Sequence, residues 1–207
     1  FFIFFASREG KVKKTALSDF ANVRRGGIIA IKIVPGDTLI EARFTSGQND
    51  VVLITSNGQS IRFHEDGVRT MGRSAAGVRG IRLGKEDHVI ALAIADPDAT
   101  LLVAGENGIG KRTEFDEYRV QARGGKGIIT MKTTKKTGKV VGALTVHDHD
   151  EIMVITVGGQ MVRITVKGIR QTGRIAQGVR LVRLVENDRL QDIAPVITAE
   201  REDEVEE

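Results

Sequence analysis

The chain has 207 residues, 41% of them hydrophobic, which is enough for one ordinary domain or for an array of small repeats with a real core. It contains no cysteine, which excludes disulfides and thiolate metal sites and fits a reducing compartment. The net charge of +4 combines two unlike parts, because residues 200–207 carry −5 and the first 199 residues therefore carry +9. The basic body indicates a polyanionic partner, and the acidic tail at 199–207 is either a competitor for the same surface or a solvated end.

The chain opens with a short apolar stretch, FFIFFA, at residues 1–6. This stretch is too short to span a membrane and has no basic flank, so it is neither a transmembrane segment nor a signal peptide. Its residues are typical of a strand, and it has no initiator methionine. We therefore expect the chain to be a piece of a longer protein.

Two markers recur along the chain with one period. The first is a glycine turn followed by a basic strand, spaced by 48, 50 and 51 residues at Gly10, Gly58, Gly108 and Gly159. The second is a glycine followed by a short apolar and basic run, spaced by 50, 50 and 51 residues at Gly27, Gly77, Gly127 and Gly178. Two independent markers with one period predict a single repeat domain over residues 1–198, with repeats at 1–49, 50–98, 99–149 and 150–198.

Each repeat has the pattern of strands. In VVLITSNGQSIRF (51–63) an apolar run, an Asn-Gly turn and an alternating run follow one another, which is typical of a β-hairpin. An apolar residue also stands ten positions after each turn glycine, at Phe20, Val68, Tyr118 and Ile169. We therefore expect Tyr118, the only tyrosine, in the core rather than at a catalytic site. Because long helical periodicity is lacking, we predict an all-β fold of four propeller-like blades, each with about four short strands.

A cation stands four residues after each turn glycine, at Lys14, Arg62, Arg112 and Arg163. Its neighbours alternate cleanly in the second and fourth repeats, whereas Lys111 adds a charge in the third. On a strand, this pattern predicts that the cation points away from the core. A further cation recurs five residues after each second-marker glycine, at Lys32, Arg82, Lys132 and Arg183.

The loops between the two markers add arginines in pairs four residues apart, while the first, shorter loop supplies Arg24 and Arg25 instead. One exposed arginine is ordinary surface, but a cation that recurs in every repeat builds a basic track around a rim. We favour a nucleic-acid track over incidental surface charge. The predicted DNA-binding residues are Lys14, Arg24, Arg25, Arg62, Arg69, Arg73, Arg112, Arg119, Arg123, Lys126, Arg163, Arg170 and Arg174.

The stretch VQARGGKGI (120–128) sets two glycines between Arg123 and Lys126. A turn this flexible and basic suits a phosphate, either of a nucleotide or of a nucleic-acid backbone. Its place in the repeat makes it an inter-strand loop, and this favours a phosphate of a nucleic-acid backbone over that of a bound nucleotide. Aromatic residues are only 4% of the chain, so there is little on which single-stranded bases could stack. We predict contacts with duplex phosphates.

Two further motifs imitate sites. GENGIGKR (105–112) nearly matches the nucleotide-binding pattern G-x-x-x-x-G-K-[ST], but Arg112 replaces the hydroxyl residue that would bind magnesium. HDHDE (147–151) occupies a linker between repeats, where a polar turn explains His147 and His149 better than a metal site. Since no Ser/His/Asp set or carboxylate pair stands out, we expect neither a catalytic residue nor a metal site.

Four stretches resemble the C-terminal repeats of DNA gyrase A: REGKVKKTALSDF, SIRFHEDGVRTMGRSAAGVRGIRL, GKRTEFDEYRVQARGGKGIITMK and MVRITVKGIRQTGRIAQGVRLVRL. The resemblance covers essentially residues 1–198, and the acidic end is similar to that family's tail. It implies a β-pinwheel, a propeller-like disc of about six blades, of which this chain would supply the C-terminal four. It also implies that duplex DNA wraps around a basic rim, so that strand passage introduces negative supercoils.

The same resemblance implies the wider setting of the domain. The whole enzyme would be an ATP-dependent type II topoisomerase, an A2B2 assembly of gyrase A with gyrase B, in the bacterial cytoplasm at the nucleoid and without a membrane partner. ATP and Mg²⁺ would bind elsewhere, so this domain would hold no cofactor, and Tyr118 would not be the catalytic tyrosine. Two alternatives stay open. One is the substrate-selecting C-terminal domain of topoisomerase IV, and the other is a propeller-like protein-interaction module.

The family's signature box, Q-[RK]-R-G-G-[KR]-G, belongs to its first blade. Residues 121–127 match six of its seven positions and depart at Ala122, where the box has a second cation. They also lie in the third repeat of this chain. We interpret them as a degenerate copy of the box, which acts as a rim contact rather than as the anchor of the wrap.

Overall fold

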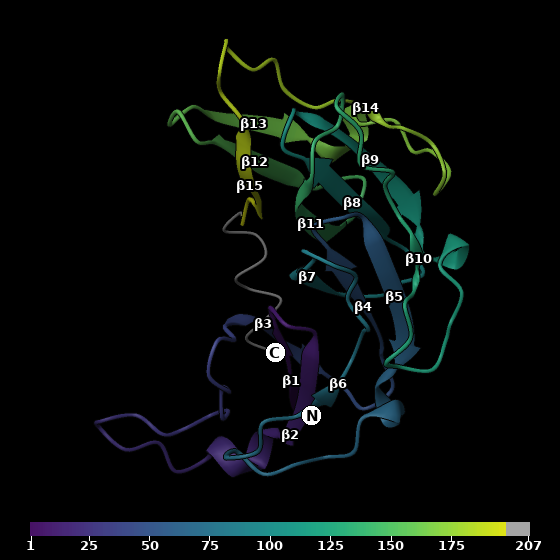
Figure 1. The fold of residues 1–207 in the computed structure, drawn as a ribbon. Helices are drawn as coiled ribbons and strands as arrows, with labels where there is room; N and C mark the ends of the chain where they lie inside the picture. The colour runs from purple at the N-terminus through teal and green to yellow at the C-terminus, as the bar shows by residue number, and fades with distance from the viewer. Residues whose placement is uncertain (198–207) are drawn as a thin grey trace.

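A computed structural model describes residues 1–197 of the chain. Within that range every regular element is a β-strand or a short 3-10 turn, which confirms the predicted all-β class. The strands form four sheets, and these sheets are the four predicted blades. They follow one another in chain order along an arc (Figure 1). No helix of residues 1–197 has both the length and the apolar surface needed to cross a membrane.

Three of the blades have four strands each. The first has the order β3-β1-β2-β6, from β3 (Leu39–Thr45), β1 (Phe2–Ser7), β2 (Lys11–Ala16) and β6 (Val78–Arg79). The second has the order β7-β4-β5-β10, from β7 (Val89–Ile94), β4 (Asp50–Thr55), β5 (Gln59–His64) and β10 (Ile128–Ile129). The third has the order β11-β8-β9-β14, from β11 (Val140–Val146), β8 (Thr100–Gly105), β9 (Ile109–Glu114) and β14 (Val179–Arg180).

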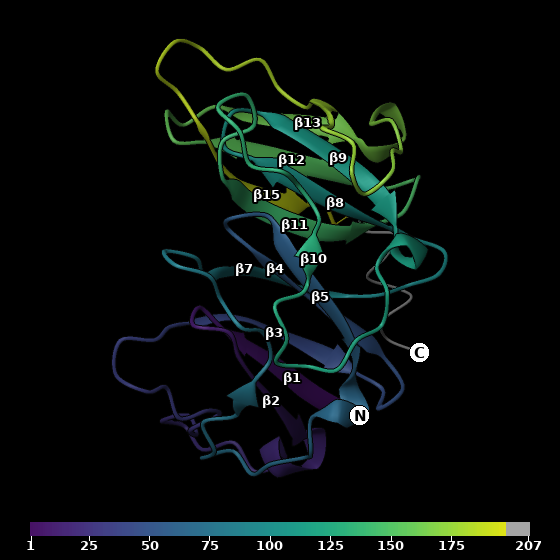
Figure 2. The ribbon, with the colours of Figure 1, turned by 45° about the vertical axis from the view of Figure 1, so that its right-hand side comes forward.

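The fourth blade has three strands within the described residues. Its order is β15-β12-β13, from β15 (Leu190–Pro195), β12 (Glu151–Thr156) and β13 (Met161–Thr165). Figure 2 shows the four blades stacked one on another. The strands β3, β7, β11 and β15 are neighbours from blade to blade and line the inner side of the arc. The short strands β6, β10 and β14 therefore lie on the outer edge.

The hairpin at the centre of each blade closes on the first marker glycine. In the second blade β4 and β5 pair from Asp50↔His64 to Ile54↔Ser60, and Asn57 and Gly58 lie in the turn between them. Gly58 has a φ of 80°, which favours glycine. A Cβ at this residue would also lie 1.9 Å from the Met131 carbonyl oxygen. The recurring glycine therefore meets two requirements, a left-handed backbone and the close approach of a neighbouring segment.

Each short strand belongs to one repeat and pairs with the blade of the repeat before it. Val12 pairs with Val78, and β10 and β14 pair in the same way with β5 and β9. The second marker glycine permits this exchange. Gly127 has a φ of 76°, and a Cβ there would lie 2.1 Å from the Ser60 carbonyl oxygen. Strand exchange thus links each pair of consecutive blades through their backbones.

Apolar side chains fill the three spaces between consecutive blades, in three separate core clusters. The prediction that Tyr118 lies in the core is confirmed, since only 1% of its surface is exposed. Val68 and Ile169 are buried at the equivalent positions. Phe20 is half-buried and packs on Phe5, with the ring centroids 6.5 Å apart. Burial therefore covers both faces of the inner blades.

Candidate nucleic-acid interface

Three of the four cations that stand four residues after the turn glycines connect blades rather than face the solvent. Lys14 and Arg112 are 5% and 7% exposed, and Arg62 is half-buried. Each of them reaches the 3-10 turn of the following repeat: η2 (Glu65–Gly67), η3 (Phe115–Glu117) or η4 (Val166–Gly168) with the residue after it. The fourth residue of a strand in one blade thereby holds the 3-10 turn at the start of the next repeat's loop.

The contacts at these junctions satisfy both the cation and the turn. Lys14 Nζ donates to the Glu65 carbonyl oxygen at 3.1 Å. Arg62 donates to the Phe115 carbonyl oxygen at 2.8 Å and pairs with Asp50, with Nε 2.8 Å from Oδ2. Arg112 Nε donates to the Ile169 carbonyl oxygen at 2.6 Å. Such charge-assisted bonds are stronger than neutral ones, so these residues act as staples between blades.

The expected outward orientation is therefore wrong for Lys14, Arg62 and Arg112. Alternation predicts an exposed cation only where one face of the strand is wet, and here the next blade covers that face. Arg163 differs, because its side chain is 52% exposed and forms an ion pair with Glu151 within its own blade. Of the four equivalent cations, only Arg163 is available to a partner.

The second arginine of each loop pair is anchored on the preceding repeat. Arg73 donates to the Ile29 carbonyl oxygen at 2.9 Å, and Arg174 donates to the equivalent Ile129 carbonyl oxygen at 2.5 Å. Arg123 donates to the Arg79 carbonyl oxygen at 2.9 Å and also to that of Gly67 at 2.7 Å. One part of each guanidinium group is thus fixed, while Arg123 is exposed and Arg73 and Arg174 are half-exposed at the outer edge.

The first arginine of each pair is exposed and unbonded. Within residues 1–197 no hydrogen bond or ion pair engages the side chains of Arg69, Arg119 and Arg170. Arg24, Arg25 and Lys126 are likewise exposed, with no such partner among the described residues. These loops run from the 3-10 turns to the exchanged strands, so they lie on the outer side of the arc. The structure thus separates unbonded cations from anchored ones within each loop.

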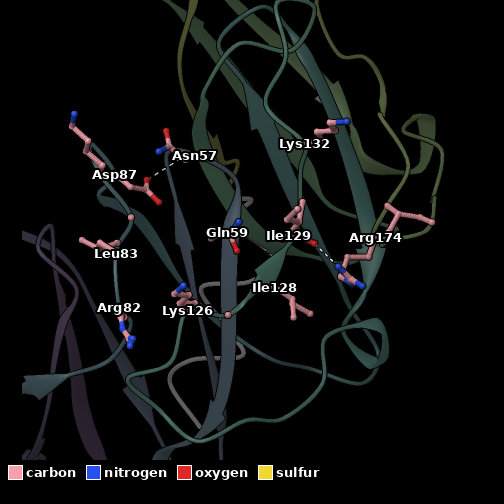
Figure 3. A pocket seen from close by; sticks show the side chains of 14 residues that line it. Asn57, Gln59, Arg82, Leu83, Asp87, Lys126, Ile128, Ile129, Lys132 and Arg174 are labelled. Atoms are coloured by element: carbon pink, nitrogen blue, oxygen red, sulfur yellow. Dashed lines mark hydrogen bonds between the residues drawn. The ribbon is translucent and has the colours of Figure 1, made fainter.

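A groove of about 800 Å³ crosses the outer edge of the second blade (Figure 3). Its lining includes the apolar residues Ile128 and Ile129 of β10. Its lining contains a single carboxylate, that of Asp87, which accepts hydrogen bonds from the backbone N–H groups of Asn57 and His88. The lining also contains five cations, which are Arg82, Lys85, Lys126, Lys132 and Arg174. This concave, strongly basic surface suits an extended polyanion.

Three of these cations were absent from the predicted set of DNA-binding residues: Arg82, Lys85 and Lys132. Arg82 and Lys132 both stand five residues after a second-marker glycine. This recurrence in the sequence could have identified them as candidate DNA-binding residues. Arg79 and Arg180 are also exposed, on the exchanged strands β6 and β14. Their signal was the repeated Gly-Val-Arg at 77–79 and 178–180.

The stretch at 120–128 has the backbone of an inter-strand loop, and part of that backbone is bonded to the preceding repeat. The Gly124 N–H donates to the Gly80 carbonyl oxygen at 2.6 Å, and the Gln121 N–H donates to that of Arg62 at 2.8 Å. The donors that a cradle would offer are thus partly engaged. Arg123 and Lys126 remain exposed on the outside of the loop. Their side chains are therefore placed to reach a phosphate here.

The two motifs that imitate sites occupy turns. Residues 105–112 span the β8–β9 hairpin, as expected from the repeat. His147 Nε2 lies 3.0 Å from Asp96 Oδ2, and its ring stacks on that of His149. Among residues 1–197 no group of three or more His, Cys, Asp or Glu side chains is placed to hold a metal ion. Burial raises the pKa of Tyr118, whose hydroxyl lies 2.6 Å from Thr130 Oγ1, so this phenol is a neutral core group.

The family model described as "DNA gyrase C-terminal domain, beta-propeller" matches the chain four times, at residues 2–46, 49–96, 99–147 and 150–197. The chain belongs to the DNA gyrase C-terminal domain family. DNA gyrase A of Mycolicibacterium smegmatis is 45% identical over 195 residues, which are 93% of this chain and 23% of that protein. The chain therefore spans about a quarter of the length of the curated relatives it matches. The resemblance inferred from the repeats is confirmed.

Two solved structures that are similar to this chain have the same fold. The C-terminal domain of DNA topoisomerase IV matches with a TM-score of 0.87 and 27% identity, over 94% of this chain and 61% of that one. The DNA gyrase A C-terminal domain matches with a TM-score of 0.84 and 26% identity, over 95% of this chain and 66% of that one. The predicted propeller-like architecture of this gyrase-family chain is thereby confirmed.

Proposed function

We propose that this chain is a DNA-binding and DNA-wrapping domain that bends duplex DNA around its basic outer edge. The observation that carries the proposal is the recurrence of exposed, unbonded arginines at equivalent points of successive blades. Arg69, Arg119 and Arg170 can meet phosphates without breaking any hydrogen bond among residues 1–197. The basic groove across the second blade lies on the same outer side.

Wrapping requires many such contacts. Bending a duplex by 40–90° over 20–30 base pairs costs on the order of 1–6 kcal/mol. Phosphate contacts from several blades offset this cost, because each releases counterions from the duplex. Within the predicted set we assign the contacts to the exposed loop cations and to Arg163, and we assign Lys14, Arg62 and Arg112 to the blade junctions.

The family membership supports a wider setting for this domain. We propose that it serves an ATP-dependent type II topoisomerase, an A2B2 assembly of gyrase A with gyrase B, which introduces negative supercoils in the bacterial cytoplasm at the nucleoid. We also propose that the four repeats belong to a larger disc, and that catalysis, ATP and Mg²⁺ are located in other parts of the enzyme. Membership of the DNA gyrase C-terminal domain family and the similarity to DNA gyrase A support this setting.

Topoisomerase IV supplies the second candidate function. Its C-terminal domain matches this fold slightly better, with a TM-score of 0.87 against 0.84, so the fold does not separate the two families. In that setting the domain would select DNA substrates. The 45% identity to a DNA gyrase A over 93% of the chain favours the gyrase setting.

Salt dependence tests the proposal directly. If about six phosphates are contacted, the logarithm of the affinity for a duplex of about 40 base pairs should fall linearly with the logarithm of the salt concentration, with a slope of about −5. A slope near zero would contradict DNA binding and would favour a protein-interaction module. The acidic tail at 199–207 lies outside the described residues. Deleting residues 200–207 should tighten binding if the tail competes, and leave it unchanged if the tail is a solvated end.

A further inference from the structure

Two buried lysines direct their charges at the loops of the proposed DNA-binding edge. Lys13 and Lys111 stand three residues after the turn glycines of the first and third repeats, on β2 and β9. Both side chains are fully buried, with 0% of the residue exposed. Fully buried lysines are rare, because removing the ammonium group from water is costly.

Both ammonium groups are held by two backbone carbonyls, at least one of which belongs to the loop of an arginine pair. Lys13 Nζ donates to the Arg73 carbonyl oxygen at 2.5 Å and to that of Ala30 at 2.6 Å. Lys111 Nζ donates to the Ala176 carbonyl oxygen at 2.7 Å and to that of Arg174. Arg73 and Arg174 are equivalent residues of their loops. The same contact therefore occurs twice in one molecule, each time on the residue that carries a loop arginine.

Burial works against the charge of both lysines. It lowers the pKa of Lys13 to about 8, with Arg73 adding to the shift and Asp19 opposing it. It lowers the pKa of Lys111 to about 8 as well, with Arg174 adding and Glu117 opposing. A charge held at such a cost is a poor choice for filling a core. The hydrogen bonds to the loop carbonyls explain why a charged side chain occupies each of these buried positions.

In the second repeat, the position equivalent to Lys13 and Lys111 holds an aliphatic residue. Ile61 occupies the equivalent position and is fully buried. The loop above it contains the Gly124–Gly125 pair, and a Cβ on Gly125 would lie 3.7 Å from Ile61 Cδ1. An aliphatic side chain at this position is thus compatible with the blade. The lysines are found beneath the two loops that lack the glycine pair.

We propose that Lys13 and Lys111 are positioning residues, which hold the loops of Arg69–Arg73 and Arg170–Arg174 in the shape that meets a phosphate backbone. This inference rests on the proposed DNA-binding function. Without the ammonium group, two carbonyl oxygens lose their donor and the loop samples other conformations. DNA binding must then order the loop again, which lowers the affinity.

Lys111→Met tests the inference, with Ile61→Met as the matched control at the equivalent buried position. We expect amide hydrogen exchange in residues 170–178 to become about tenfold faster in Lys111→Met and to stay unchanged in residues 120–127. The dissociation constant for a duplex of about 40 base pairs should rise about 3- to 10-fold. Ile61→Met should change neither measurement, because it keeps an aliphatic side chain in the core.

Chemical rescue separates positioning from general stability. Since the chain has no cysteine, Lys111→Cys carries a single thiol. It can be alkylated in denaturant with 2-bromoethylamine, which restores an ammonium group, or with iodoacetamide, which does not, and then refolded. We expect the aminoethylated chain to regain slow exchange and tight binding, and the carbamidomethylated chain to regain neither.

Each outcome decides the inference. If amide hydrogen exchange in residues 170–178 were unchanged in Lys111→Met, the proposal that Lys111 holds this loop would be wrong. Faster exchange with unchanged affinity would refute its role in DNA binding. If the unaltered chain bound no duplex at any salt concentration, the proposed function would fail instead, and the exchange comparison would still decide whether the lysine holds the loop.

Discussion

Arg112 and Arg163 occupy equivalent positions in neighbouring repeats and have opposite surroundings. The Arg112 side chain is 8% exposed and bonds Asp148 and the Ile169 carbonyl oxygen of the next repeat. The Arg163 side chain is 52% exposed, and its one ion-pair partner among residues 1–197 is Glu151 of its own blade. A cation of the same type thus has a junction role in one repeat and a surface position in the other.

This contrast predicts different costs for the same substitution. Arg112→Met leaves the Ile169 carbonyl without its charged donor at a blade junction, and we expect it to lower the free energy of unfolding by about 2–4 kcal/mol. Arg163→Met should leave the urea midpoint unchanged, because exposed ion pairs contribute little. Urea denaturation of the two variants side by side checks this, and equal midpoints would contradict the junction role of Arg112.

The two buried lysines predict a dependence of stability on pH. Their pKa of about 8 in the folded chain lies below the ordinary value of 10.5, so the unfolded chain binds more protons between these values. By linkage, their contribution to the free energy of unfolding rises as the pH increases from about 8 to 10.5. As the pH increases over this range, the melting temperature of the unaltered chain should therefore rise relative to that of the double variant Lys13→Met/Lys111→Met. A difference that stays constant over this range would contradict the burial of the charges.

The sequence predicted the positions of the cations better than their directions. Tyr118 was correctly expected in the core, because an apolar residue recurs at its position in every repeat. Lys13 and Lys14 are adjacent on β2 and both are buried, which alternation cannot predict. An alternating apolar and polar pattern indicates burial only where one face of the strand is exposed to solvent. In this fold the stacked blades cover both faces of the strand.

At the scale of elements, a short exchanged strand joins consecutive blades through their backbones. β10 is two residues long, and Ile128 pairs with Ser60 of the preceding repeat. The segment stays close to that blade because Gly127 accepts a backbone conformation that brings it against the Ser60 carbonyl. The pairing of the two residues of β10 with β5 therefore depends on Gly127.

Gly127→Ala should disrupt this exchange. A Cβ would lie 2.1 Å from the Ser60 carbonyl oxygen, and the φ of 76° disfavours an L side chain. We expect the free energy of unfolding to fall by about 3 kcal/mol or more. Gly72→Ala is the matched control, because a Cβ at that loop glycine meets nothing within 4 Å. Similar urea midpoints for the two variants would show that the exchange does not need this glycine.

The exchange itself was outside the reach of the sequence pattern. Hairpins such as β4–β5 have an apolar run and a turn signal, so they were predicted. Val78–Arg79 and Ile128–Ile129 are too short for any periodicity, and their partners are in another repeat. The second marker was recognised by its spacing, but its physical reason, a close backbone contact between blades, appears only in the structure.

At the scale of the whole molecule, the blades form an arc whose outer edge carries the arginine loops (Figure 1). The inner strands β3, β7, β11 and β15 are neighbours and spread the outer edges apart. A duplex on the outside would meet Arg69, Arg119 and Arg170 in turn. The period of the sequence thus places one exposed, unbonded loop arginine at the equivalent point of three successive repeats, where the proposed phosphate contacts would recur.

The salt dependence of a triple variant tests this central claim most directly. Arg69→Ala/Arg119→Ala/Arg170→Ala removes three exposed side chains that make no hydrogen bond within residues 1–197, so the fold should be kept. If each arginine contacts one phosphate, the slope of log affinity against log salt should flatten by about 3 relative to the unaltered chain, for every duplex sequence alike. An unchanged slope would contradict a phosphate track along these loops.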